Sequence, residues 1–316
     1  MAGVGDSRFD SDVAGAPALE ARRLRKQFGG RDVVNDVSFH VKSGEVVGLV
    51  GPNGAGKTTT IRMMLGILAP DEGEARALGG PLTEETQERI GYLPEERGLY
   101  EGLRLTVVLS YLGQLKGLSR RHAAIRTGEM LDAVGMSEHA HKKVRELSRG
   151  MTQLVQFGAT LLHRPDILVL DEPFSGLDPV NARRMKELVL EEKERGAAII
   201  FSTHQMTDVE ELSDRVLMID GGEVALDGAP SELRRRYRGD TIRVESPDAP
   251  PASISGVGEV VRSAESISMR LTDRATAEQV LKQLLDAGMR IERFEVALPT
   301  LEEIFIREVQ GRRGTR

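Results

Sequence analysis

Residues 46–58 read VVGLVGPNGAGKT, a short apolar run followed at once by a glycine-rich loop. The apolar run is typical of a buried strand in a parallel sheet. Beyond the loop, Ile61, Met64 and Leu65 recur at helical spacing, and Pro70 marks the end of this pattern. A strand, a glycine-rich loop and a helix in this order are the context that a phosphate-binding loop requires. The stretch therefore predicts an α/β fold that binds a nucleotide at the start of the helix.

The loop residues are expected to surround the phosphate groups. Successive amides of residues 54–58 can form a cationic concavity at the helix N-terminus, which suits a β-phosphate. The Lys57 ammonium is expected to neutralise β- and γ-phosphate oxygens, the Thr58 hydroxyl to bind Mg²⁺, and Thr59 to contact the α-phosphate. The nucleotide-binding residues predicted here are Gly51, Pro52, Asn53, Gly54, Ala55, Gly56, Lys57, Thr58 and Thr59.

A second apolar strand, residues 167–170, ends in Asp171 and Glu172. We expect Asp171 to help hold Mg²⁺, because it lies at the carboxyl end of the strand. Adjacent residues of a strand point in different directions, so Glu172 can reach a water molecule in line with the γ-phosphate. Glu172 is therefore the candidate general base or water-positioning group, and a solvated acid at a strand end is the alternative.

Two further residues are candidates for contact with the nucleotide. His204 follows the apolar run 198–203, at the sheet edge where ligands bind in open α/β sheets. We expect it to contact the γ-phosphate and to steady Glu172. Phe28 precedes the first apolar strands, and its ring can either stack on adenine or pack against the protein.

The segment Leu147-Ser148-Arg149-Gly150 indicates how the site is completed. Ser148 is a good helix N-cap, and the positive end of the helix dipole points outward from this position. Its hydroxyl and the Gly150 amide can therefore clamp a γ-phosphate. In a head-to-tail twofold dimer, each clamp would face the nucleotide of the other copy.

Length and composition limit the other possibilities. A chain of 316 residues suggests two domains, and a net charge of −6 argues against a nucleic-acid partner. The absence of cysteine excludes disulfides and thiolate metal sites. No apolar run approaches the ~20 residues that cross a bilayer, and residues 1–17 read as a disordered lead without a signal peptide. We expect a cytoplasmic protein that reaches a membrane only through partners.

Periodicity outlines the remaining structure. Residues 103–147 are mainly helical in pattern, with Gly113, Gly117 and Gly135 as expected breaks. Asp178-Pro179 predicts a helix start, with an N-cap acid and proline at the first position. Strands and helices alternate, so the core is expected to be α/β with a mostly parallel sheet. Beyond a proline-rich stretch, alternating strand and helix patterns predict a small C-terminal α+β domain without a catalytic constellation.

In order and spacing, these elements resemble the nucleotide-binding subunit of ATP-binding cassette (ABC) transporters. The resemblance covers about residues 18–235 and rests on the following segments: Gly51–Thr58, Leu147–Gly150, Asp171-Glu172, Ser175-Gly176-Leu177-Asp178 and His204. It implies a P-loop core with a mostly parallel sheet, an antiparallel β subdomain and a helical subdomain. It also implies ATP and Mg²⁺ held between two copies, or between one copy and a paralogous cassette. Hydrolysis at Glu172, His204 as a switch residue and Asp178 communicating across the dimer are implied as well.

The resemblance carries expected boundaries: a lead at 1–17, an ATPase domain at 18–238 with its helical subdomain at about 96–162, and an accessory domain at 239–316. Three positions in two motifs depart from the family pattern. Arg149 and Met151 stand where the family usually has Gly and Gln, and Glu95 occupies the position of a Gln that contacts Mg²⁺ and the attacking water. Glutamate can coordinate a metal but, when ionised, cannot donate a hydrogen bond, so Glu95 is a candidate catalytic residue and metal ligand.

Residues 298–305 resemble the C-terminal segment of prokaryotic cassettes that serve sodium- or drug-type exporters. The resemblance implies separate multispanning permease subunits and a position on the cytoplasmic face of the cell membrane. The accessory domain is expected to stabilise or regulate the dimer, or to be a packing domain. The alternative function is a soluble ABC-type ATPase acting on ribosomes or DNA, although the chain carries one cassette and no long coiled coil. A small-molecule kinase would leave the Ser148 segment unexplained.

Overall fold

The computed structural model describes residues 16–96, 98–237, 241–263, 266–272 and 275–314. The expected disordered lead lies outside these ranges except for Ala16 and Pro17. The chain divides into two compact units that meet between Asp227 and Gly228, and each unit is described by itself. Among the described residues, no helix combines the length and apolar character that crossing a bilayer requires.

The first unit is built on a six-stranded sheet with strand order β10-β9-β3-β8-β7-β6. Its strands are β3 (Val46–Val50), β6 (Ile90–Leu93), β7 (Ile167–Asp171), β8 (Ala198–Thr203), β9 (Arg215–Asp220) and β10 (Glu223–Gly228). β3 pairs in parallel with β8 and β9, and β7 pairs in parallel with β8 and β6. Every residue of β3, β7 and β8 is buried, which explains why these strands are continuous apolar runs in the sequence. The predicted mostly parallel sheet is confirmed.

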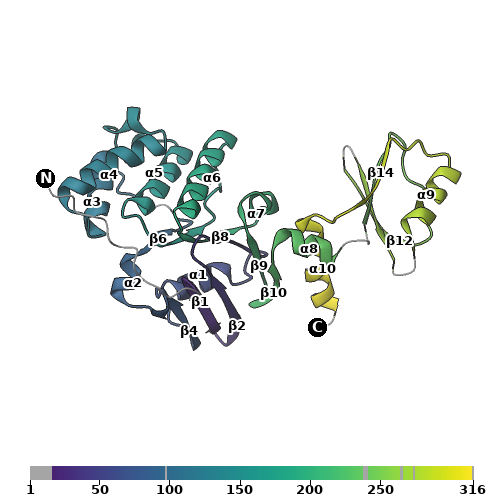
Figure 1. Cartoon of the computed structure of the whole chain (residues 1–316), viewed down its shortest axis with the longest axis horizontal. Coiled ribbons are helices and arrows are strands. Elements are labelled where there is room, and N and C mark those ends of the chain that lie inside the picture. The colour runs from purple at the N-terminus through teal and green to yellow at the C-terminus, as the bar shows by residue number, and fades with distance from the viewer. Residues whose placement is uncertain (1–15, 97, 238–240, 264–265, 273–274, 315–316) are drawn as a thin grey trace. The chain divides into compact units, whose positions relative to one another are not determined.

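A second, antiparallel sheet has the order β2-β1-β4-β5. It comprises β1 (Leu19–Phe28), β2 (Arg31–Val41), β4 (Glu72–Ala77) and β5 (Gly80–Pro81). Helix α1 (Lys57–Met64) shares one hydrophobic core with both sheets, and Figure 1 shows it between them. The phosphate-binding loop is thereby fixed from two sides. The short helix α2 (Glu84–Glu88) follows β5.

The helical part of the first unit contains three longer helices. These are α3 (Leu105–Leu115), α4 (Arg120–Ala133) and α5 (Arg149–Leu161), with 3₁₀ turns η1 (Ser137–His139) and η2 (Val144–Glu146). The predicted breaks at Gly117 and Gly135 are confirmed, and both have positive φ. The predicted break at Gly113 is wrong. Gly113 lies inside α3, where an added Cβ would be 3.4 Å from Ala123 Cβ, so the glycine admits a close approach of α4.

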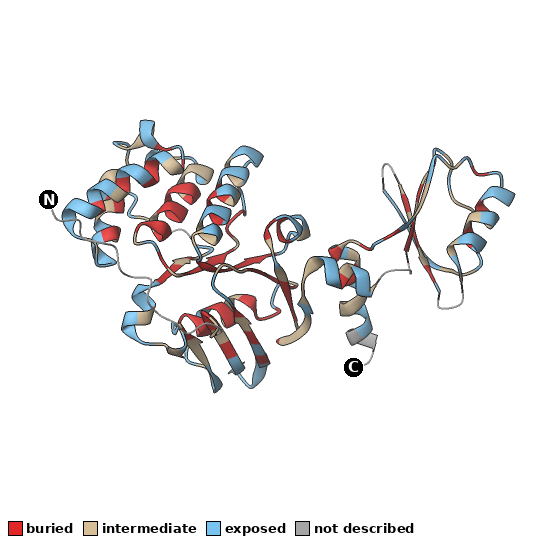
Figure 2. Cartoon of the chain, in the orientation of Figure 1, coloured by how far each residue is buried: buried red, intermediate tan, exposed pale blue. Residues whose placement is uncertain are grey.

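Helix α5 differs from its neighbours in burial. Figure 2 shows α5 buried along much of its length, whereas α3 and α4 keep exposed outer faces. Helix α6 (Pro179–Glu194) begins with the predicted Asp178 cap and proline, and α7 (Met206–Leu212) follows β8. The Arg184 guanidinium of α6 donates to the Ala133 carbonyl at 2.7 Å and to the Asp132 carbonyl at 2.9 Å, which fastens the end of α4 to α6.

The second unit is a small α+β fold, as the sequence predicts. It comprises α8 (Pro230–Arg236), β11 (Thr241–Glu245), β12 (Val257–Arg262), β13 (Ile267–Leu271), α9 (Ala277–Asp286), β14 (Arg293–Ala297) and α10 (Leu301–Gly314). The strands form an antiparallel sheet of order β12-β13-β11-β14, and α9 packs its buried Val280 and Leu284 into the core. Residues 228–237 belong to this unit because α8 contacts α10, and the Tyr237 hydroxyl bonds to the Glu308 carboxylate. The second unit thus begins at Gly228, ahead of residue 239, where the accessory domain is expected to start.

Candidate nucleotide site

The phosphate-binding loop opens onto a cleft of about 260 Å³ in the first unit. The cleft is lined by Val33, Asn53, Gly54, Ala55, Gly56, Lys57, Thr58, Thr59, Glu95, Asp171 and Glu172. It lies where β3 and β7 end and α1 begins. The structure therefore brings together most of the predicted loop residues and three of the predicted carboxylates, Glu95, Asp171 and Glu172.

Gly56 is the N-cap of α1 and has a left-handed φ of 105°. An added Cβ would be 2.6 Å from the Val33 carbonyl oxygen, so both the backbone conformation and the close approach of β2 require glycine. No side chain of the residues that the structure describes caps the helix. The first amides of α1 are therefore left for an anion, as in other helix N-terminal phosphate sites.

The Lys57 ammonium is held inside the loop that precedes it. It donates hydrogen bonds to the Gly51 carbonyl at 2.7 Å and to the Pro52 carbonyl at 3.2 Å. Gly51 and Pro52 thus contribute carbonyl oxygens to the site without lining the cleft. Burial lowers the pKa of Lys57, and the neighbouring carboxylates, Glu172 foremost, oppose that shift. A buried cation beside carboxylates is well placed to donate hydrogen bonds to triphosphate oxygens.

Asp171 and Glu172 are tied together by Ser202, a residue that sequence reasoning missed. The Ser202 hydroxyl donates to Asp171 Oδ1 at 2.5 Å and accepts the Glu172 amide at 3.0 Å. Ser202 lies opposite Asp171 in the register of β7 and β8, and both side chains are almost fully buried. The sequence signal that could have identified Ser202 is its polar side chain near the end of the otherwise apolar strand β8.

Glu172 lies at the end of β7 in a strained conformation with φ 49°. Non-glycine residues held in this region cost about 1–3 kcal/mol, and they are frequent at active sites. Glu172 Oε2 lies 3.0 Å from His204 Nδ1, while the His204 side chain is 57% exposed. Burial raises the pKa of Glu172, and the hydrogen bond from His204 opposes this shift. The sequence-based pairing of Glu172 with His204 is thus present in the structure.

Besides Gly51, Pro52 and His204, four predicted site residues do not line the cleft. Ser148 caps α5 by accepting the Met151 amide at 3.3 Å, and Gly150 faces Leu177 and Asp178 of its own chain. Asp178 caps α6, and hydrogen bonds, chiefly from the Asn181 amide, hold its pKa below the usual value. The fourth residue is the aromatic candidate for adenine stacking.

The ring of Phe28 is 51% exposed at the end of β1. The Lys26 ammonium lies 5.8 Å from its centroid, a cation–π contact on the protein's own surface. No described side chain is stacked face to face on Phe28 among the aromatic contacts of the structure. The ring is therefore accessible to a planar ligand.

Comparison with known proteins identifies the class. A model of the ABC transporter family matches residues 34–175. The uncharacterized ABC transporter ATP-binding protein YhaQ of Bacillus subtilis (strain 168) is 37% identical over 293 residues, which cover 92% of this chain and 98% of the relative. The chain belongs to the ABC transporter ATP-binding proteins.

Further comparisons describe this ABC protein in more detail. The Nod factor export ATP-binding protein I of Paraburkholderia xenovorans (strain LB400) is 34% identical over 298 residues, 92% of this chain and 96% of the relative. A solved ATP-binding subunit of an ABC transporter superposes with a TM-score of 0.65 at 32% identity, covering 70% of this chain and 93% of that one. Residues 228–309 match the C-terminal domain of DrrA1-3-like ATP-binding proteins. The protein is an ABC ATPase that binds ATP and works with transmembrane partner subunits.

The cleft of the ABC ATPase also offers oxygen ligands of the kind that Mg²⁺ prefers. The Thr58 hydroxyl and the Asp171 and Glu95 carboxylates belong to residues that line it. Within the described ranges, no group of three or more His, Cys, Asp or Glu could hold a metal by itself. This pattern fits Mg²⁺, which is usually held by one or two carboxylates together with substrate phosphates.

His204→Ala is expected to move the acid limb of the ATPase pH profile to higher pH. The His204 hydrogen bond opposes the burial that raises the pKa of Glu172, so removing the imidazole raises this pKa further. A carboxylate must be deprotonated to act as a base, and activity would then be lost earlier as the pH falls. Steady-state rates across pH would show the shift, with exposed His141→Ala as the control. An unshifted limb would contradict the coupling.

Proposed function

We propose that this ABC ATPase is the motor subunit of an exporter and that two copies close head to tail over two molecules of Mg·ATP. The observation that carries the proposal is the separation of the site's parts within one chain. The triphosphate-binding loop and its carboxylates line one cleft, whereas the exposed Ser148 and the half-buried Gly150 at the start of α5 lie outside it. A second copy, or a paralogous cassette, would supply its own α5 N-terminus to complete the site.

The size of the cleft supports the same arrangement. Pockets that enclose a small ligand usually measure about 300–1,000 Å³, whereas this cleft measures about 260 Å³. A nucleotide bound here would keep one side uncovered. Closing a second copy over that side would exclude water and bring the Ser148 hydroxyl to the γ-phosphate, where a charge-assisted hydrogen bond stabilises the closed state.

In the closed state, Glu172 would accept a proton from a water molecule in line with the γ-phosphate. The water oxygen bonds to phosphorus as the bond to the bridging oxygen of ADP breaks, which yields ADP and inorganic phosphate. His204 holds the Glu172 carboxylate, and Lys57 stabilises the charge on the phosphate oxygens. Mg²⁺, held by Thr58, Asp171 and Glu95 beside the phosphates, would neutralise charge on the β- and γ-oxygens. Asp178 would link this site to the partner copy.

Export is the direction that the similar proteins favour. One relative is a Nod factor export ATP-binding protein, and the C-terminal unit matches that of DrrA-like proteins. We place the protein on the cytoplasmic face of the cell membrane, bound there by separate permease subunits. The second unit would stabilise or regulate the dimer.

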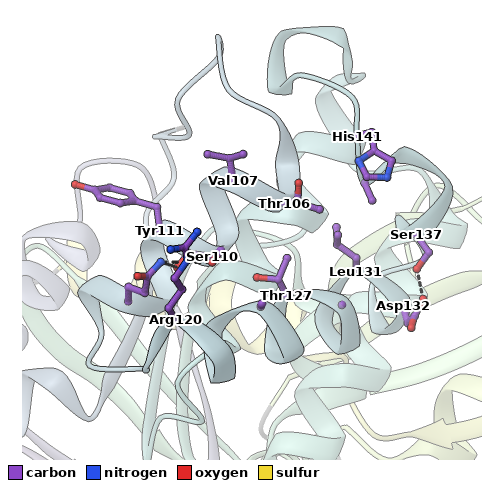
Figure 3. Close-up of a pocket in the computed structure, with 14 residues that line it drawn as sticks. Thr106, Val107, Ser110, Tyr111, Arg120, Thr127, Leu131, Asp132, Ser137 and His141 are labelled. Carbon is purple, nitrogen blue, oxygen red and sulfur yellow. Dashed lines mark hydrogen bonds between the residues drawn. The ribbon is translucent and has the colours of Figure 1, made fainter.

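The outer side of α3 is the surface we assign to the permease. Val107, Tyr111 and Leu115 follow each other at four-residue spacing and are 45–62% exposed. Figure 3 shows Val107 and Tyr111 on one side of a groove of about 750 Å³, with Thr127 and Leu131 of α4 on the other. An exposed apolar stripe beside a groove fits the apolar face of a short cytoplasmic helix of the permease.

The double variant Val107→Glu/Tyr111→Glu is expected to abolish co-purification with the multispanning permease. Two carboxylates in an apolar contact would be desolvated without partners, whereas ATP hydrolysis by the isolated subunit should stay at the wild-type rate. Affinity purification from membranes expressing both subunits measures the effect. Ile125→Glu is the control, because Ile125 is exposed on α4 but does not line the groove. Wild-type recovery of the permease with the double variant would refute this surface.

A further inference from the structure

Helix α5 carries two buried glutamines on one face, one turn apart. Gln153 and Gln156 are 4% and 5% exposed. The Gln153 side-chain amide donates to the Pro173 carbonyl at 3.2 Å, and the Gln156 amide donates to the Glu96 carbonyl at 3.1 Å. Pro173 directly follows Glu172, and Glu96 directly follows Glu95. One helix therefore holds the backbone beside two of the carboxylates that line the cleft.

The buried side chain of Gln156 costs free energy that a purely apolar side chain at this position would not. Gln156 Oε1 is buried and has no hydrogen-bond partner among the described residues. A buried polar atom without a partner costs about 1–3 kcal/mol, whereas methionine would fill a similar volume without that cost. Gln156 is thus a poor choice for a purely structural core position, and its one hydrogen bond goes to the loop that carries Glu95.

Helix α5 is in direct contact with the segments that carry Glu95 and Glu172. Gly91 of β6 lies so close to α5 that an added Cβ would be 2.7 Å from the Thr160 carbonyl oxygen. β6 leads into the Glu95 segment, and the N-terminus of the same helix is capped by Ser148. A displacement of α5 would therefore carry the Glu96 and Pro173 carbonyls with it, through the two glutamine side chains.

We propose that Gln153 and Gln156 are positioning residues that set Glu172 and Glu95 relative to the bound triphosphate. Each acts through a backbone carbonyl and touches neither nucleotide nor metal. The Glu95 position lacks the side-chain amide that the family pattern carries there, and Gln156 instead fixes this loop from α5. The inference rests on the proposed roles of Glu95 and Glu172 in the site.

The test compares Gln156→Met and Gln153→Met with the wild type. Affinity for the non-hydrolysable analogue AMP-PNP is measured by calorimetry, once with Mg²⁺ and once with EDTA. For Gln156→Met we expect the gain in affinity from Mg²⁺ to fall by about tenfold, a size typical of substitutions that remove a hydrogen-bond partner of a metal ligand. The affinity in EDTA should be unchanged. For Gln153→Met we expect kcat to fall by about tenfold at unchanged KM, because the base moves while ATP binding is kept.

Val155→Ala is the control for lost packing, because Val155 is fully buried on the same helix and contacts neither loop through a side-chain hydrogen bond. It should lower the melting temperature without changing either readout. Wild-type values in both methionine variants, or equal losses in Val155→Ala, would overturn the proposal. Glu95→Ala distinguishes a failure of the positioning role of Gln156 from a failure of the proposed role of Glu95. If it weakens the Mg²⁺ effect while Gln156→Met does not, only the positioning role is wrong. If it has no effect either, the role of Glu95 is wrong as well.

Discussion

Glu172→Gln is expected to lower the rate of ATP hydrolysis by about 1,000-fold and to leave ATP binding intact, since a general base contributes about 10²–10⁴-fold. The amide has nearly the same shape as the carboxylate but cannot accept the proton from water. ATP then persists in the site, and the closed dimer that we propose should accumulate, because in the proposed cycle hydrolysis reopens it. This substitution therefore separates binding from chemistry.

Two measurements check this result. Phosphate release gives the rate, and light scattering after chromatography in Mg·ATP gives the mass of the complex. Glu96→Gln is the matched control, since Glu96 is an exposed carboxylate that does not line the cleft. Hydrolysis by Glu172→Gln at the wild-type rate would show that another group is the base. A monomer in Mg·ATP would count against closure.

Lys57→Ala is expected to weaken ATP binding by roughly 100-fold or more, because removing a buried charged partner costs about 2–5 kcal/mol. The ammonium is buried in the loop, and triphosphate oxygens would replace the carboxylates as its counter-charge. Calorimetric titration with Mg·ATP measures the loss. Lys116→Ala is a close control, because that ammonium also donates to two backbone carbonyls, those of Gln87 and Ile90, away from the cleft. Equal losses for both variants would contradict a specific role for Lys57.

The parts of the fold that the sequence predicted are those with local signals. The phosphate-binding loop needs glycine at positions such as Gly56, and fully buried strands such as β7 must be apolar throughout. The start of α6 followed from an Asp cap and a proline, which act within one turn. Such features are set by neighbours in the chain, so a single sequence contains them.

The features that the sequence missed depend on contacts between distant segments. Ser202 joins Asp171 and Glu172 across 30 residues, and its role follows from the register of two strands. Gln153 reaches a loop twenty residues away, and Gln156 reaches one sixty residues away. The sequence pattern predicts a helix break at Gly113, because the packing of this glycine against α4 has no sequence signal. Tertiary packing decided each of these cases.

In the dimer that we propose, each ATP site combines the loop of one copy with the Ser148 segment of the other. Lys57→Ala disables the loop. Ser148→Asp keeps a good N-cap for α5 but places a negative charge against the γ-phosphate. Each variant alone should be nearly inactive. Random pairing of the two puts about half of the dimers in mixed pairs, each with one intact composite site.

The decisive measurement is the ATPase rate of the Lys57→Ala and Ser148→Asp proteins mixed in equal amounts. Composite sites predict recovery to about a quarter of the wild-type rate, since half of the dimers then carry one of two sites. Sites contained within single chains predict no recovery. A mixture that forms dimers in Mg·ATP but is no more active than the separate variants would contradict composite sites.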